Sequence, residues 1–212
     1  MIESYITVSH PASEEITISK SRFIGYAAPF REESDALGFL NRIKDEHRTA
    51  RHHCYAYIIG ENSGIMRYSD DGEPGGTAGM PIMDVMKVRN IVNCCIVVVR
   101  YFGGILLGTG GLVRAYTQSA LAVLQSAGIV RMELTADDYC VIPYTVWDRF
   151  RYEADRLPVR IENIDYGADI GFHLLYRTSD SSSVLPRLMD ASDRKLESIH
   201  QNDLFAEWKI EQ

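Results

Sequence analysis

The sequence lacks any apolar run that approaches the roughly 20 residues of a membrane-spanning helix. Its first residues include Glu3, Glu14 and Glu15, and they lack both the basic block and the apolar block of a signal peptide. With 212 residues, 46% of them hydrophobic, the chain is large and apolar enough to bury one or two cores. These features predict a globular protein of the cytoplasm that makes no membrane contact.

Basic residues are also scarce. The chain has 22 Lys and Arg residues against 29 Asp and Glu residues, which gives a net charge of −7. Residues 1–134 are nearly neutral, with 13 basic and 14 acidic side chains, whereas residues 135–212 have 9 and 15. A whole-molecule attraction to nucleic acid is therefore disfavoured, and any such contact would need a local patch on the N-terminal part.

Only four cysteines are present, at positions 54, 94, 95 and 140, and no two of them have C-x-x-C spacing. Cys94 and Cys95 belong to an apolar segment. A reactive thiol needs an exposed, electropositive setting, which this segment does not suggest. The pattern predicts reduced cysteines that pack in the interior.

What the sequence does contain is a strand, a glycine loop and a helix in succession. Ile96–Val99 is a short β-branched run, which predicts a strand that is buried on both faces and stops at Arg100. Helical spacing begins at Leu112, after five glycines. Free N–H groups and the positive end of a helix dipole suit an anion. The predicted anion-binding residues are Arg100, Tyr101, Gly103, Gly104, Gly108, Thr109, Gly110, Gly111 and Arg114.

A second interpretation of these glycines is structural. They would permit positive φ angles and close packing of the helix on the sheet, with Arg100 and Arg114 in ordinary ion pairs. The neighbouring aromatic residues also have two interpretations. They would either stack on bases or pack in the core, and they are Tyr55, Tyr57, Tyr101 and Phe102.

A long loop is predicted for residues 61–81, which are rich in glycine. Its acidic-loop residues are Asp70, Asp71, Glu73 and Thr77. The three carboxylates would hold Mg²⁺, form a solvated turn, or neutralise Arg100 and Arg114.

His52 begins the strand-like segment RHHCYAYII. It is predicted to act as a general base or to pair with a carboxylate, so the catalytic candidates are His52, Asp71 and Glu73. No further ligand lies at a spacing typical of zinc, so no metal site is assigned.

The remaining N-terminal pattern predicts strands at Ile16–Ile18 and Phe23–Ala28. A helix follows, capped by Ser34 and ending near Arg48. A second helix has Pro81 in its first turn.

Past residue 134 the pattern changes to strand, helix, two strands, helix and strand, which predicts an α+β domain of βαββαβ order. Its first helix would be capped by Thr145 and run to Leu157, and its last strand would lie near Phe205–Ile210. We therefore predict domains at residues 1–133 and 134–212.

Three segments together resemble the IMPACT family, in its bacterial YigZ branch. They are RHHCYAY (51–57), SDDGEPGGTAGMPI (69–82) and VVRYFGGILLGTGGLVRAY (98–116). The resemblance covers nearly the whole chain. It implies an α/β N-terminal domain of the ribosomal-protein-like βαβ kind and a ferredoxin-like C-terminal domain similar to one in elongation factors.

The resemblance also implies a link to translation. Eukaryotic relatives regulate translation by competing for a kinase activator through an additional N-terminal domain, which has no counterpart in this sequence. For the bacterial branch it implies contact with RNA, the ribosome or a phosphate-bearing ligand. Relatives often have Ser in place of Gly75 and a basic residue in place of Leu106, and both differences weaken a polyanion site here.

Our preferred prediction is a non-enzymatic regulator linked to translation, which binds RNA, the ribosome or a phosphate-bearing ligand at the glycine loop. It needs no cofactor. The alternative is a Mg²⁺-assisted hydrolase or phosphoryl-handling enzyme that uses His52, Asp71 and Glu73. A third option is a module that contacts a translation-related protein through its C-terminal domain.

Overall fold

The computed structural model describes residues 2–208. The chain divides into two compact units, one formed mainly by residues 4–131 and the other by the chain from residue 132 onward. Both units combine helices with antiparallel sheets, so the predicted α+β class is confirmed. None of the helices within residues 2–208 is long and apolar enough to cross a membrane.

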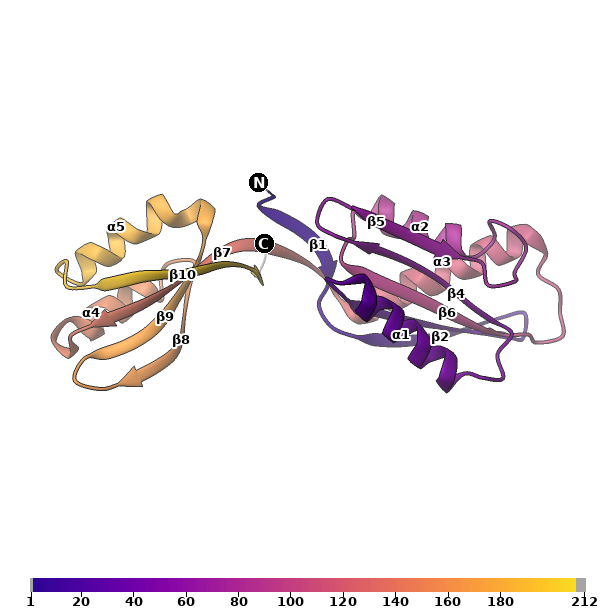
Figure 1. Cartoon of the computed structure of the whole chain (residues 1–212), viewed down its shortest axis with the longest axis horizontal. Coiled ribbons are helices and arrows are strands. Elements are labelled where there is room, and N and C mark those ends of the chain that lie inside the picture. Colours follow the sequence, from indigo (N-terminus) through magenta and orange to yellow (C-terminus); the bar gives the residue numbers. More distant parts are fainter. Residues whose placement is uncertain (1, 209–212) are drawn as a thin grey trace. The chain divides into compact units, whose positions relative to one another are not determined.

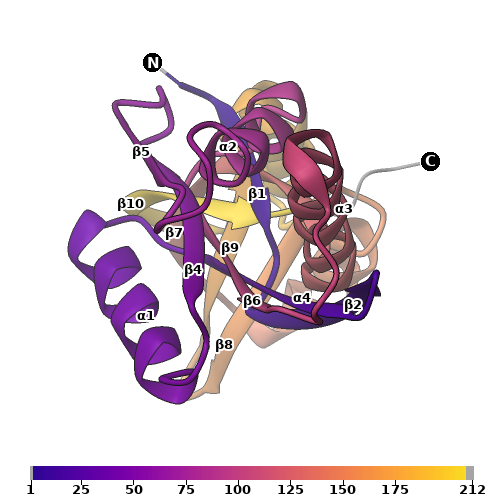
Figure 2. The ribbon, with the colours of Figure 1, turned by 90° about the vertical axis from the view of Figure 1, so that its right-hand side faces the viewer.

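The N-terminal unit is built on a five-stranded antiparallel sheet of order β2-β3-β6-β4-β5. The strands are β2 (Ala12–Ile18), β3 (Ser21–Pro29), β4 (His52–Ile59), β5 (Ile65–Ser69) and β6 (Cys94–Tyr101). One face is covered by α1 (Glu33–Glu46), and the other by α2 (Gly79–Val88) and α3 (Gly108–Ala127), as Figure 2 shows. A short strand, β1 (Ser4–Val8), lies beside the segment before β6, where the Val92 N–H donates to the Ile6 carbonyl at 2.9 Å.

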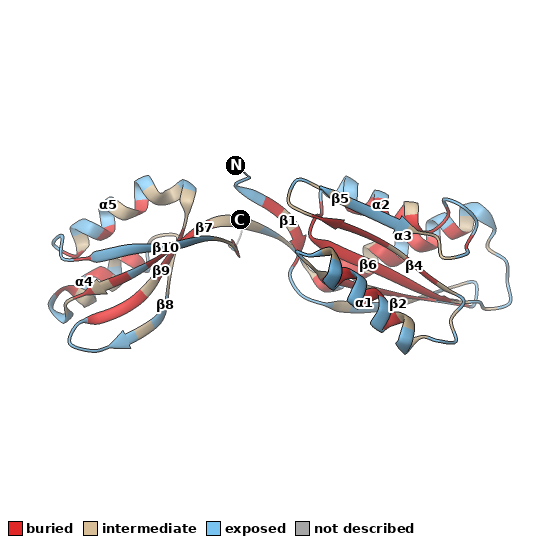
Figure 3. Cartoon of the chain, viewed as in Figure 1, coloured by how far each residue is buried: buried red, intermediate tan, exposed pale blue. Residues whose placement is uncertain are grey.

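Strand β6 is the centre of this unit. Residues 94–99 have no exposed surface, because helices cover both faces of the strand and β3 and β4 flank it (Figure 3). The predicted doubly buried strand is therefore confirmed, and it is longer than predicted at both ends. All four cysteines are free and buried, as the sequence predicted.

Three predictions in this unit are wrong. Residues 61–81 are not one loop: Ile65–Ser69 pairs with β4 as an edge strand, whose exposed side chains hide it from pattern analysis. Helix α3 begins at Gly108 rather than Leu112, because packing of its buried face outweighs the low helix propensity of glycine. Helix α1 begins at Glu33 after an extended Glu32, so Ser34 lies inside the helix and does not cap it.

The C-terminal unit follows the predicted βαββαβ order. Its elements are β7 (Ile129–Ile142), α4 (Tyr144–Ala154), β8 (Val159–Tyr166), β9 (Ile170–Arg177), α5 (Ser181–Ala191) and β10 (Glu197–Glu207), with a 3₁₀ turn at Thr178–Asp180. The strands run β10-β7-β9-β8. Figure 1 shows α4 and α5 beside the strands of this sheet. Phe150 of α4 and Leu188 of α5 pack with Phe172 of β9 in one core.

Boundaries in this unit differ from the prediction in three places. Helix α4 starts at Tyr144 after Pro143, whose ring fixes φ near −68°, so Thr145 is not the cap. The helix ends at Ala154 and not at Leu157. The last strand begins earlier than predicted, at Glu197, and Ile210 lies outside the described residues.

Phe150→Ala should destabilise the C-terminal unit by about 3–5 kcal/mol, because it removes a fully buried ring from the core. Both tryptophans of the chain, Trp147 and Trp208, belong to this unit, so tryptophan fluorescence during urea unfolding reports on it alone. Tyr152→Ala on the same helix, at a 59% exposed site, is the control and should cost less than about 1 kcal/mol. Equal losses in both variants would contradict the core assignment.

Candidate functional site

The predicted site residues gather at one end of the N-terminal sheet, the end at which β6 finishes. Tyr101 pairs with Arg22 at the start of β3, and Arg100 pairs with His52 at the start of β4. The 70–78 loop reaches the same end, because the His52 Nδ1–H donates to the Asp71 carbonyl at 2.8 Å. The antiparallel register therefore brings the glycine loop, His52 and the acidic loop together.

Arg100 and Glu73 form a buried ion pair. The Arg100 Nη1 lies 2.7 Å from the Glu73 Oε1, and the two side chains are only 7% and 4% exposed. The same oxygen accepts a hydrogen bond from the Tyr116 hydroxyl of α3 at 2.8 Å. Glu73 was predicted to hold Mg²⁺, to lie in a solvated turn or to neutralise an arginine. In the structure it neutralises Arg100.

The Arg100 guanidinium has one unsatisfied group. Its Nε–H is buried and makes no hydrogen bond within residues 2–208. The guanidinium carbon lies 5.5 Å from the centre of the Phe23 ring and 5.6 Å from that of Phe102. Contact with two aromatic rings offsets part of the cost of burying this charge.

Tyr116 of α3 and Cys54 of β4 extend the buried cluster beyond the ion pair. The Cys54 thiol lies 3.3 Å from the Tyr116 hydroxyl and 3.0 Å from the Asp70 carbonyl. Burial raises the pKa of both Tyr116 and Cys54, so both groups stay protonated at neutral pH. Tyr116 therefore acts as a hydrogen-bond donor to Glu73, and Cys54 is not a thiolate nucleophile in this state.

The acidic-loop carboxylates serve three different partners. Asp70 accepts hydrogen bonds from the backbone N–H groups of Gly76, Ala78 and Gly79 at 2.8–3.0 Å, which satisfies the free N-terminus of α2. Asp71 accepts the His53 backbone N–H at 2.6 Å, and Glu73 is paired with Arg100. Thr77 donates to the Pro74 carbonyl at 2.7 Å.

Metal binding would require these carboxylates to give up their present partners. In the described chain, no group of three or more His, Cys, Asp or Glu side chains is arranged to hold a metal ion. The carboxylates of Asp70, Asp71 and Glu73 are thus already engaged within the protein, through hydrogen bonds and one ion pair.

The glycine loop is anchored at Gly103 and exposed beyond it. A Cβ at Gly103 would lie 2.0 Å from the Lys20 carbonyl group, so only glycine allows the loop to approach the β2–β3 turn this closely. After this contact the loop turns outward, and Ile105 and Leu106 are 44% and 87% exposed. Phe102, just before it, is 51% exposed. The tip of the loop is therefore apolar rather than basic.

The first turn of α3 faces solvent with bare backbone. The N-cap residue, Leu107, makes no side-chain hydrogen bond to this helix, and a Cβ at Gly108 or Gly110 would meet nothing within 4 Å. Gly108 has φ +67°, a conformation that favours glycine. Arg114 is exposed, lies one turn further along, and forms no ion pair in the described chain. The helix therefore presents free N–H groups beside an uncommitted cation.

The structure separates the predicted anion-binding residues into two sets. Arg100 is buried with Glu73, and the Tyr101 hydroxyl contacts His47 Nδ1 at 2.9 Å. Gly104, Gly108, Thr109, Gly110 and Arg114 are exposed, and Gly103 and Gly111 are half-buried. Phe23 and Lys20 of the β2–β3 region carry no sequence signal for this site, because only the sheet register places them beside Arg100 and Gly103.

Arg100→Met should destabilise the N-terminal unit by about 3–5 kcal/mol, because the buried Glu73 carboxylate loses its counter-charge. The double variant Arg100→Met/Glu73→Gln should recover most of this loss, since no unpaired charge remains. Circular dichroism during urea unfolding measures both. Arg48→Met, which breaks the exposed pair with Asp45, is the control and should cost less than about 1 kcal/mol. A double variant as unstable as Arg100→Met alone would contradict the ion-pair argument.

The thiols should be almost unreactive in the folded protein. All four cysteines are buried, and burial raises the pKa of Cys94 and Cys140 to about 12. We expect slow reaction with a disulfide reagent such as 5,5′-dithiobis(2-nitrobenzoate) in buffer and fast, complete reaction in urea. Rapid reaction of one thiol in buffer would show that the site opens.

Comparison with known proteins agrees with this architecture. The Impact N-terminal domain model matches residues 19–124. The IMPACT family member YvyE of Bacillus subtilis (strain 168) is 38% identical over 183 residues, covering 86% of this chain and 84% of that protein. YigZ of Escherichia coli (strain K12), also an IMPACT family member, is 44% identical over 117 residues, or 54% of this chain and 57% of that protein.

A solved structure described as a hypothetical protein is similar over 95% of this chain and 99% of its own, with a TM-score of 0.61 and 31% identity. The family model covers the strands and loops that form the candidate site. The chain therefore belongs to the IMPACT family.

Proposed function

We propose that this protein is a non-enzymatic regulator linked to translation that binds RNA through a glycine-turn site. We define this site as Gly108–Gly111, Arg114 and Phe102. Its RNA-binding role would combine a backbone phosphate on the first turn of α3 with a base on Phe102. The link to translation rests on the family resemblance, and the C-terminal βαββαβ unit is proposed to be ferredoxin-like on the same ground.

One observation carries the proposal: the bare first turn of a 20-residue helix, open to solvent. The first N–H groups of a helix have no intrahelical partner, and the helix dipole adds positive potential there. Glycines leave these groups accessible to a phosphate oxygen. Arg114 follows Gly110 by four residues, so it lies on the same helix face, and its side chain leans back toward the N-terminus.

Phe102 supports RNA over a simple inorganic anion. Its ring is about half exposed and lies against the Arg100 guanidinium, so one face is held while the other part is free for a base. Stacking on an exposed aromatic ring contributes to the binding of single strands with little sequence preference. Because the N-terminal part is nearly neutral and Leu106 is apolar, we expect contact with one or two phosphates rather than a long tract.

Binding is favoured over hydrolysis by the state of the acidic loop. A Mg²⁺-assisted hydrolase would use His52, Asp71 and Glu73. Glu73 is paired with Arg100, and Asp71 holds the backbone at the start of β4. Both carboxylates would have to leave buried or half-buried partners to bind a metal, at a cost that solvent-exposed carboxylates do not have.

Gly110→Asp tests the site without threatening the fold. The new side chain projects into open space, and an acidic residue in the first turn favours the helix. We expect affinity for a fluorescein-labelled oligouridine, measured by anisotropy at low salt, to fall about tenfold or more because a carboxylate occupies the phosphate position. Arg114→Gln should weaken binding less and reduce the salt dependence by about one phosphate contact.

Gly38→Asp is the matched control. It makes the same substitution at an exposed helical glycine on α1, where a Cβ also meets nothing within 4 Å. Its affinity for the oligonucleotide should equal that of the unaltered protein. Binding that is unchanged in Gly110→Asp, or that falls equally in Gly38→Asp, would refute the glycine-turn site.

A further inference from the structure

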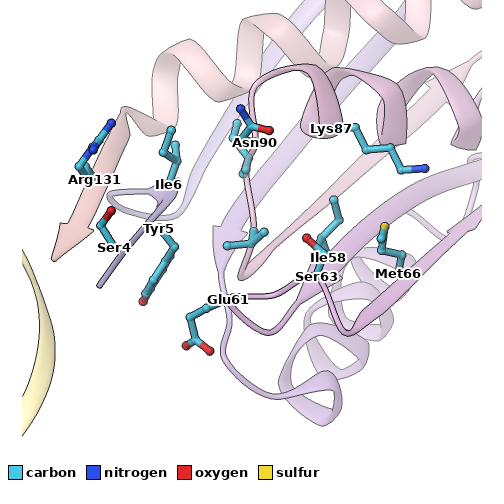
Figure 4. A pocket seen from close by; sticks show the side chains of 12 residues that line it. Ser4, Tyr5, Ile6, Ile58, Glu61, Ser63, Met66, Lys87, Asn90 and Arg131 are labelled. Carbon is cyan, nitrogen blue, oxygen red and sulfur yellow. The ribbon is translucent and has the colours of Figure 1, made fainter. Parts of the chain in front are cut away.

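A second concave site lies in the N-terminal unit at the opposite end of the sheet from the glycine turn. It has a volume of about 440 Å³, within the range of small-molecule pockets. Its walls come from β1, from the turn between β4 and β5, and from the end of α2 (Figure 4). No part of the glycine-turn site contributes to it, so the two sites are independent.

The floor of this pocket is apolar and well packed. Ile58, Ile91 and Val92 are buried and close its base. Ile6 and Met66, which are partly exposed, provide accessible apolar surface beside Tyr5. A floor of this kind would bury the apolar body of a ligand without rearrangement.

The rim of the pocket carries uncommitted polar groups. In Figure 4, Arg131 and Lys87 lie on opposite sides of the cavity, with Asn90 between them on the upper rim. The Ser4 and Ser63 hydroxyls complete the set. Among the residues that the structure describes, none of these five side chains has a hydrogen-bond or ion-pair partner.

Asn93 holds the walls of the pocket in place. Its buried side chain accepts the Gly60 N–H at 2.8 Å and lies 3.3 Å from the Glu61 Oε1, which fixes the β4–β5 turn. Its carbonyl accepts the Thr7 hydroxyl at 3.2 Å, which fixes β1. The pocket is therefore preformed, which lowers the entropic cost of binding.

The charge of the pocket selects the class of ligand. Lys87 and Arg131 provide two positive charges, whereas Glu61 is the single acidic residue of the lining and is already in contact with Asn93. An anionic group would gain charge-assisted hydrogen bonds from either cation, and bidentate ones from the guanidinium.

We propose that this pocket binds a small organic acid, in which a carboxylate or phosphate group is joined to an apolar body. The apolar body lies against Tyr5, Ile6 and Met66 above the closed base, and the acidic group lies against Lys87 or Arg131. This site is separate from RNA binding at α3, so either proposal stands if the other fails.

The test uses the full chain and three probes that share a benzene ring and differ in their polar group. The probes are benzoate, phenyl phosphate and the neutral benzyl alcohol. Two-dimensional ¹H–¹⁵N spectra should show saturable shifts at residues 4–6, 61–63 and 87–92. Benzoate and phenyl phosphate distinguish a carboxylate site from a phosphate site by their relative affinity. Benzyl alcohol should bind several-fold more weakly than the better anion, because it lacks the charge.

The double variant Lys87→Gln/Arg131→Gln should lower the affinity for the better-binding anion about tenfold and leave the affinity for benzyl alcohol unchanged. Arg89→Gln, an exposed change two residues from Lys87 and outside the pocket, is the control and should not alter binding. The proposal is overturned if no probe causes shifts at these residues at millimolar concentration. It is also overturned if benzyl alcohol binds as tightly as both anions, or if the double variant keeps full affinity.

Discussion

The buried ion pair between Glu73 and Arg100 is the interaction on which the candidate site depends. It joins the 70–78 loop to the central strand β6, and Tyr116 adds α3 to the same carboxylate. Burying two charges is costly, and a buried pair is weak evidence for stability. Its effect here is to fix positions: the 70–78 loop, β6 and α3 meet at the Glu73 Oε1 atom.

The two ends of the N-terminal sheet carry different chemistry because the strands around β6 run antiparallel to it. At the end of β6, the start of β4 and the start of β3 bring His52, Arg22 and the glycine loop together. At the other end, the close of β4 and the approach to β6 leave a cavity that β1 closes on one side. One end carries the exposed first turn of α3, and the other carries a cavity with charged residues on its rim.

Much of the fold could be predicted from local pattern. The short β-branched run before Arg100 favoured a buried strand over a helix, and the βαββαβ order of the C-terminal unit followed from periodicity. Edge strand β5 was missed because an exposed edge has no alternating pattern. The first turn of α3 was missed because glycines argue against a helix until Leu112, Ala115 and Tyr116 are packed on the sheet.

The sequence by itself determined the α+β class, the central strand, the buried cysteines and the glycine segment, because each depends on neighbours along the chain. Only the tertiary structure decided which cation is free. Arg100 and Arg114 are equivalent in the sequence, yet strand pairing and helix packing bury one against Glu73 and leave the other in solvent. The cavity beside β1 is also tertiary, since its lining comes from segments between residues 4 and 131 that no local pattern connects.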